Sequence, residues 1–212
     1  MLALVGVGAL FACAPMVGGS GRSVATALAA DWSWLKADLA WETRDEVRAR
    51  SWSALAVRAA PQSDYFRFNA ARMRAFDFPA WREVREPAAP PALRARWRAE
   101  LGEEAIALVL AGGERSAGSL IEAGNLALYA LRDVSRAAEF YRRAAELPDA
   151  PWHAGRIYAE LLRQSGQSRE ALAWLKRWLP RLPADDPAAQ RALVAARIEA
   201  LERELAPPGE AL

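Results

Sequence analysis

Two segments of the C-terminal half decide the fold: Leu131-Arg-Asp-Val-Ser-Arg-Ala137-Ala-Glu-Phe-Tyr141-Arg-Arg-Ala144 and Gln164-Ser-Gly166-Gln-Ser-Arg-Glu-Ala171-Leu-Ala-Trp-Leu175-Lys-Arg-Trp178. Each places a turn before a helix, and the matching residues Ala137 and Ala171 lie 34 positions apart. A period of that length is typical of helical hairpins that stack, because one hairpin cannot bury its apolar face alone. The sequence therefore predicts an all-α fold of stacked antiparallel hairpins.

The composition fits closely packed helices. The chain has 212 residues, of which 53% are hydrophobic, and nine are Trp. Much of the excess is Ala, the best helix former, while Trp fills gaps between helices or anchors a partner. The bases are Arg except for Lys36 and Lys176, which indicates a GC-rich, bacterial genome. The formal net charge is only +2 and no basic stripe carries interleaved aromatics, so we expect no nucleic-acid partner.

The N-terminal segment is apolar and leaves three interpretations open. Residues Leu2 to Val17 carry no charge and are slightly too few for the ~20 that span a bilayer. The first interpretation is a retained signal anchor. The second is a signal peptide cleaved after Ala27-Leu28-Ala29, and the third is a lipoprotein acylated on Cys13, unless upstream residues are missing. As Cys13 is the single cysteine, a disulfide within one chain is excluded.

The side of the membrane is also open. Arg22 follows the apolar run and no base precedes it, which by the positive-inside rule would leave the body in the cytoplasm. The signal-like residues before Asp31 favour export instead. We expect a membrane-anchored protein with its body on the extracytoplasmic (periplasmic) side, or else a secreted protein or lipoprotein.

Turn signals and proline divide the chain into five parts. Thr43 and Glu46 fit a capping box that opens a helix, and Asp186 fits the N-cap of the last one. Prolines near Phe78 are expected to break the helical pattern and to leave at most a short helical turn at Ala80 to Val84, because proline lacks the amide donor. The predicted parts are a signal peptide or anchor over 1–30, a helical hairpin region over 31–76, an irregular Pro-rich connection over 77–91, helical repeats with a capping helix over 92–205, and a disordered tail over 206–212.

The region from Gly118 to about Asp185 resembles the tetratricopeptide repeat. In that family a small residue at the helix crossing is followed four positions later by an aromatic and then by another Ala. Ala137, Tyr141 and Ala144 match this pattern, Ala171 and Leu175 match in part, and Gly166 lies where the family often places its turn glycine. The resemblance implies a right-handed α-solenoid that binds partners in a concave groove lined by the first helix of each hairpin.

Carried onto this chain, the resemblance assigns a set of groove residues. They are Glu122, Leu126, Tyr129, His153, Arg156, Glu160 and Arg163. Some family members clamp a terminal carboxylate with Lys and Asn, but Leu126 and Glu160 stand here where Asn is needed. Arg156 and Arg163 can still pair with an acidic segment through charge-assisted hydrogen bonds.

The sequence contains no constellation that predicts catalysis, a cofactor or a metal. His153 is the single histidine, and Glu160 lies two helical turns from it. Zinc needs paired ligands, and a phosphate loop needs Lys-Ser/Thr after its glycines; neither pattern occurs. Trp174 and Trp178 share a helix face, which favours core packing over a binding hot spot.

These patterns predict a non-enzymatic scaffold or adaptor, associated with the membrane or exported. Its expected partners are another protein or peptide segment, and the membrane through the N-terminal segment. The alternative is an enzyme or a small-ligand-binding protein with a site near the 77–91 segment, because long loops in compact domains often carry function. Asp77, Trp81 and Arg82 are the residues to test for that alternative.

Overall fold

The computed structural model describes residues 24–113 and 116–206, and within these ranges all regular structure is helical. The expected all-α class is confirmed. No helix in this part of the chain is both long and apolar enough to cross a bilayer. The elements are α1 (Val24–Glu42), α2 (Glu46–Ala59), α3 (Asp64–Arg72), a π turn (Met73–Asp77), α4 (Phe78–Arg85), α5 (Pro91–Leu110), α6 (Ala117–Tyr129), α7 (Val134–Ala145), α8 (His153–Gln164), α9 (Ser168–Trp178), short 3-10 turns at Leu179–Arg181 and Pro187–Ala189, and α10 (Arg191–Leu205).

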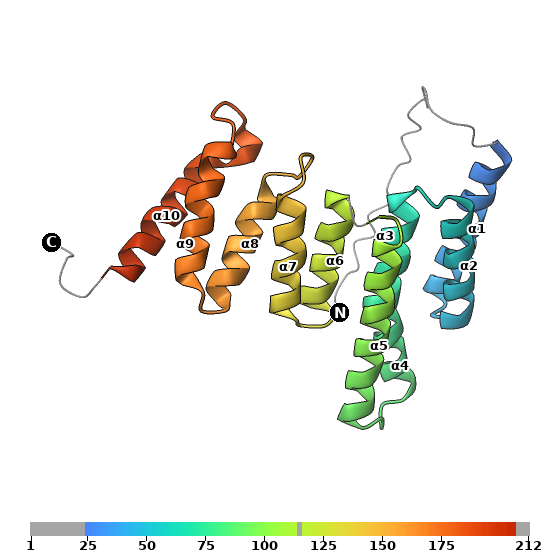
Figure 1. The fold of residues 1–212 in the computed structure, drawn as a ribbon. Coiled ribbons are helices and arrows are strands. Elements are labelled where there is room, and N and C mark those ends of the chain that lie inside the picture. Colours follow the sequence, from blue (N-terminus) through green and yellow to red (C-terminus); the bar gives the residue numbers. More distant parts are fainter. Residues whose placement is uncertain (1–23, 114–115, 207–212) are drawn as a thin grey trace, which may run out of the picture.

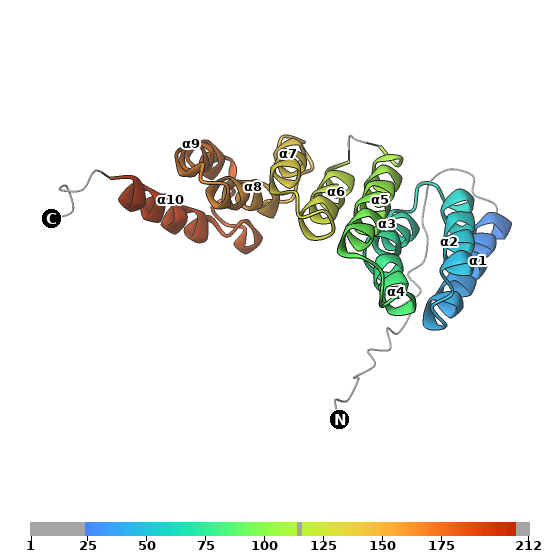
Figure 2. The same cartoon turned by 90° about the horizontal axis from the view of Figure 1, so that it is seen from below.

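The helices form an elongated row in chain order, from α1 at one end to α10 at the other (Figure 1). The main contacts join neighbours along the chain: α1 with α2, then α5 with α6, and α6 through α10 each with the next. Helix α3 also contacts α5 and α6. The view from below shows the same order, with α1 outermost beside α2 (Figure 2).

The prediction of an irregular connection over 77–91 was wrong for most of its length. Helix α3 continues through the π turn into α4, so the chain is helical up to Arg85 and irregular only over residues 86–90. Pro79 lies in the first turn of α4, where a missing amide is tolerated, directly after the widened π turn. Phe78 and Trp81 are buried, with ring centroids 5.4 Å apart.

Three predicted boundaries also moved. Helix α1 begins at Val24, so the boundary at residue 30 falls inside it. The N-cap of α2 is Asp45, whose Oδ1 accepts from the Arg48 amide at 3.0 Å, while Thr43 bonds backward to the carbonyl of Ala40 at 3.1 Å. Asp186 caps the 3-10 turn rather than α10. Cys13 and residues 207–212 lie outside the described ranges.

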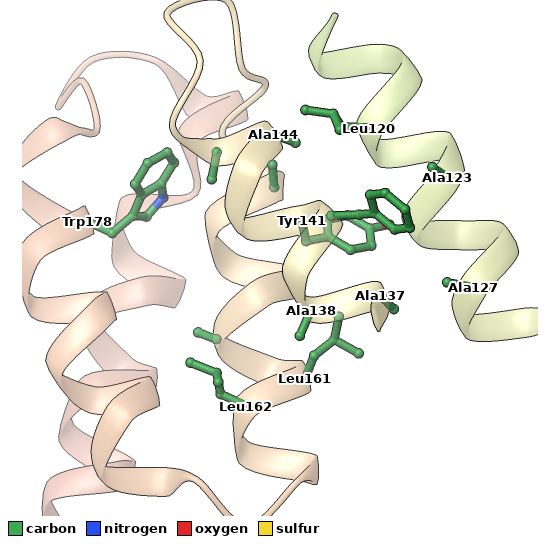
Figure 3. Packing of buried hydrophobic residues seen from close by; sticks show 14 of the residues in the cluster. Leu120, Ala123, Ala127, Ala137, Ala138, Tyr141, Ala144, Leu161, Leu162 and Trp178 are labelled. Carbon is green, nitrogen blue, oxygen red and sulfur yellow. The ribbon is translucent and has the colours of Figure 1, made fainter. Parts of the chain in front are cut away.

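The core from α5 to α10 is built on the small residues that the sequence singled out. Ala137, Ala144 and Ala171 are fully buried. Tyr141 and Leu175 are almost fully buried. Figure 3 shows the Tyr141 ring lying from α7 towards α6, among alanines. Its hydroxyl donates to Asn125 Oδ1 at 2.6 Å, which satisfies the one polar atom that the ring buries.

Two glycines let consecutive helices cross closely. A Cβ at Gly124 would lie 2.9 Å from the Tyr141 ring, and one at Gly155 would lie 2.4 Å from Trp178 Cε2. Both distances are shorter than carbon atoms tolerate, so each ring occupies the space that a side chain would need. The same arrangement thus joins α6 to α7 and α8 to α9, and Trp178, nearly fully buried, belongs to the core as expected.

Two buried carboxylates join helices that are far apart in the chain. Glu46 on α2 is buried and accepts from Arg82 on α4, at 2.5 Å, and from Arg85, at 2.6 Å. Burial alone would raise the pKa of Glu46, but the hydrogen bonds and charges of the two arginines outweigh it and lower this pKa. Glu122 on α6 is likewise buried and accepts two bonds of 2.7 Å from Arg72 on α3.

Candidate ligand-binding groove

A groove of about 460 Å³ lies between α8 and α10, and Leu175 of α9 forms part of its floor. On α8 the residues Arg156, Glu160 and Arg163 recur every three or four positions, which places them on one helix face. The floor is apolar and comes from three helices: Ile157, Ala159, Leu175, Leu193, Val194, Ala196, Ala200 and Leu201. An apolar floor edged by a few polar groups is the usual construction of a ligand site, and this volume falls in the usual range.

The chain between α9 and α10 fixes the second wall of the groove. The Trp152 indole donates from Nε1 to Asp186 Oδ2 at 3.0 Å, which ties the start of α8 to this connection. Arg191, the first residue of α10, donates from Nη1 to the carbonyls of Leu179 and Leu182 at 2.8 Å each. These bonds hold the N-terminus of α10 against the end of α9.

The rim of the groove is positively charged. Glu160 accepts from Arg163 Nη2 at 2.7 Å and lies 3.5 Å from Arg197 Nη2 on α10. The bonds from Arg163 lower the pKa of Glu160, so this carboxylate stays ionised at neutral pH. Arg156 donates to Gln190. The rim therefore carries three guanidinium groups and one carboxylate, and this excess of positive charge suits a ligand that carries acidic groups.

The structure brings together three of the seven predicted groove residues. Arg156, Glu160 and Arg163 line the groove, whereas Glu122 and Leu126 are buried in the core. Helix α6 is covered by α3 and α5 on one side and by α7 on the other, so these two residues have no open face. We correct their assignment: Glu122 is an ion-pair partner of α3, and Leu126 is a core residue.

The other two predicted groove residues lie elsewhere. Tyr129 is exposed and borders a separate hollow of about 270 Å³ with Phe76, Pro79 and Glu83. His153 is exposed at the start of α8 and does not line the groove. Partial burial, and to a lesser degree the charge of Arg156, lower the pKa of this imidazole.

Residues proposed for a site near the 77–91 segment have structural partners. Trp81 is buried and Arg82 is bonded to Glu46. Asp77 borders a third hollow of about 270 Å³, which Trp34 and six other residues line, and burial raises its pKa. In the described ranges, no three His, Cys, Asp or Glu side chains lie together as metal ligands would.

The groove residues on α10 were not predicted from the sequence. The charged residues of α10 predict a solvated capping helix, and most of them are indeed exposed. The same helix, however, presents Leu193, Val194 and Arg197 to α8. The available signal in the sequence was Leu193, a large apolar residue among the charged residues of the predicted capping helix; the structure shows it 52% exposed.

Comparison with known proteins assigns no family to this arrangement: no protein-family model matches the chain, and no curated protein matches it.

Proposed function

We propose that this protein is a non-enzymatic adaptor of the tetratricopeptide type, and that the α8–α10 groove binds a peptide segment of another protein. The observation that carries the proposal is the groove itself, with its apolar floor and its excess of arginine. The ligand chemistry follows from it: one or two apolar side chains enter the floor, and flanking carboxylates pair with Arg156, Arg163 or Arg197.

The fold proposal rests on separate observations. The 34-residue offset between Ala137 and Ala171 coincides with two fully buried helix crossings. Gly166 has φ +77 in the turn before α9, a backbone conformation that glycine adopts without strain. The glycine and ring contacts repeat in both hairpins. These features support a right-handed α-solenoid, whose terminal helix α10 here also forms a groove wall.

A site-specific cross-link tests the groove. A photoreactive phenylalanine analogue at Leu193 should capture the partner in intact cells, because this side chain is 52% exposed within the groove. The same analogue at Glu199, exposed on α10 but outside the groove, is the control. If both positions give the same adducts, the groove is not the binding site.

A charge reversal measures the contribution of the rim. Arg197→Glu should weaken binding of the captured partner by about tenfold or more, since a hydrogen bond between ionised groups contributes about 1.5–3 kcal/mol. Arg203→Glu makes the same charge change on an exposed part of α10 outside the groove and should leave affinity within about twofold. Equal losses from both variants would show only general electrostatic attraction and would remove the proposed site.

We further propose that the segment before α1 associates the protein with a membrane, with the helical body on the extracytoplasmic side. The uncharged run from Leu2 to Val17 supports this. Mass spectrometry of the native N-terminus distinguishes a retained anchor, a cleaved signal and an acylated Cys13. Protease digestion of intact cells tests the side: a body that is protected until the membrane is lysed contradicts the extracytoplasmic placement.

A further inference from the structure

Helix α1 is apolar on the face that the other described residues, 43–113 and 116–206, leave exposed. Its buried residues are small and lie against α2: Ala30, Ser33, Ala37 and Ala40. Its large apolar residues point the other way and are each between 47% and 76% exposed: Val24, Leu28, Trp32, Leu35 and Leu39. A continuous apolar stripe of this kind on a surface helix marks an interaction site.

The spacing of the stripe is that of a coiled-coil seam. Leu28, Trp32, Leu35 and Leu39 follow one another at intervals of four, three and four residues. This is the alternation of d and a positions in a heptad repeat, with Leu28 and Leu35 at d and Trp32 and Leu39 at a. We call these four residues the α1 seam. The seam calls for a second helix with the same spacing, rather than a flat surface.

The charges beside the seam select the direction of that second helix. In this register Asp31 occupies a g position and Lys36 the following e position. In a parallel pair a g residue faces the e residue five positions later in the partner, so Asp31 would meet Lys36 of the other copy on both sides. Lys36 is held at the seam edge, with its Nζ 4.7 Å from the centre of the Trp32 ring. An antiparallel pair would instead oppose like charges.

We propose that α1 pairs in parallel with α1 of a second copy of this chain. The approach is open, because α1 is outermost in the row and the seam faces away from α2 (Figure 2). A lipid surface suits the stripe less well, since Asp31, Asp38 and Glu42 border it where interfacial helices carry Lys or Arg. The pairing does not depend on the α8–α10 groove, so neither proposal fails with the other.

Disulfide cross-linking of the full chain in detergent tests the pairing. In a Cys13→Ser background, which has no other cysteine, Leu35→Cys should form a covalent dimer on mild oxidation, and so should Leu28→Cys when the N-terminal segment is retained. In a parallel coiled coil, d residues of the two copies face each other within disulfide reach. Arg48→Cys, on the exposed surface of α2, is the control and should stay monomeric. Sedimentation of the unsubstituted chain should give the mass of a dimer.

Charge exchange tests the direction of the pairing. Asp31→Lys alone should weaken dimerisation by about tenfold, because two symmetric pairs become repulsive, and Asp31→Lys with Lys36→Asp should restore it. A double variant as weak as the single one would overturn the parallel register. A monomeric chain whose tryptophan fluorescence is quenched by brominated phospholipid vesicles, with less quenching after Trp32→Phe, would overturn the proposal and show that the seam lies on lipid.

Discussion

The substitution Gly155→Ala tests how closely α8 and α9 are packed. The added Cβ would lie 2.4 Å from Trp178 Cε2 and 2.6 Å from Cδ2. The ring has little freedom to move: Trp174 stacks on it at 5.7 Å between centroids, and the Arg181 guanidinium lies 4.4 Å from its centre. Trp174 is itself tied to this crossing, because its Nε1 donates to the Gly155 carbonyl at 2.8 Å.

Two effects of opposite sign decide the outcome. Ala is a better helix former than Gly by about 0.5–1 kcal/mol, which favours the variant. Overpacking a closed core costs about 1–3 kcal/mol, which opposes it. As the clash is with a buried ring rather than with the end of a flexible chain, we expect a net loss of about 1–2 kcal/mol. For a protein of this size the Tm should fall by roughly 3–6 °C.

The assay is urea unfolding followed by far-UV circular dichroism and tryptophan fluorescence. Gly118→Ala is the matched control, because its Cβ would meet only Ser116 Oγ at 3.6 Å, and it should be neutral or slightly stabilising. The double variant Gly155→Ala/Trp178→Leu should lose less stability than the sum of the two single losses, because the smaller side chain removes the clash. If Gly155→Ala is as stable as the unsubstituted protein, the close crossing of α8 and α9 is refuted.

Two further predictions concern buried polar contacts. Glu46→Gln should lower the free energy of unfolding by about 1.5–3 kcal/mol, since ionic hydrogen bonds to Arg82 and Arg85 are lost. Because the folded pKa of Glu46 lies below its usual 4.5, this side chain stabilises the fold above pH 4.5, and the stabilisation is lost as the pH falls through the folded pKa. In urea titrations from pH 6 to pH 3, the free energy of unfolding should therefore fall less steeply in the variant than in the unsubstituted protein. Tyr141→Phe should cost about 0.5–1.5 kcal/mol through the lost bond to Asn125, and an unchanged midpoint would contradict that bond. Burial raises the pKa of Tyr141 to about 12, so its contribution to the free energy of unfolding is present below pH 10 and is lost between pH 10 and pH 12. The Tyr141→Phe variant should not show this loss.

Local pattern predicted the C-terminal helices well. Ala137, Tyr141, Ala144 and Ala171 gave the packing positions because a helix crossing needs small residues at fixed intervals, and this requirement is visible in a short window of sequence. Gly166 marked the turn before α9 for a similarly local reason, its positive φ.

Contacts between distant segments explain what the sequence could not show. Glu122 was expected in a groove, but its partner Arg72 lies 50 positions earlier in the chain. Pro79 indicated a break, but the preceding π turn and the burial of Phe78 and Trp81 keep the segment helical. The groove needs Arg197 from α10 beside Glu160 from α8, and no periodic pattern predicts which faces of two helices meet.

The order of contacts along the row has a mechanical consequence. From α6 to α9 the main contacts join each helix to the next helix in the chain. Helix α10 has its main contacts with α9 and with the 3-10 turn Leu179–Arg181 that follows α9. A pulling force on the C-terminus would therefore peel α10 away first and leave the other helices in place. Because α10 supplies Val194 and Leu201 to the groove, such tension would open the proposed peptide site before the remaining chain extends.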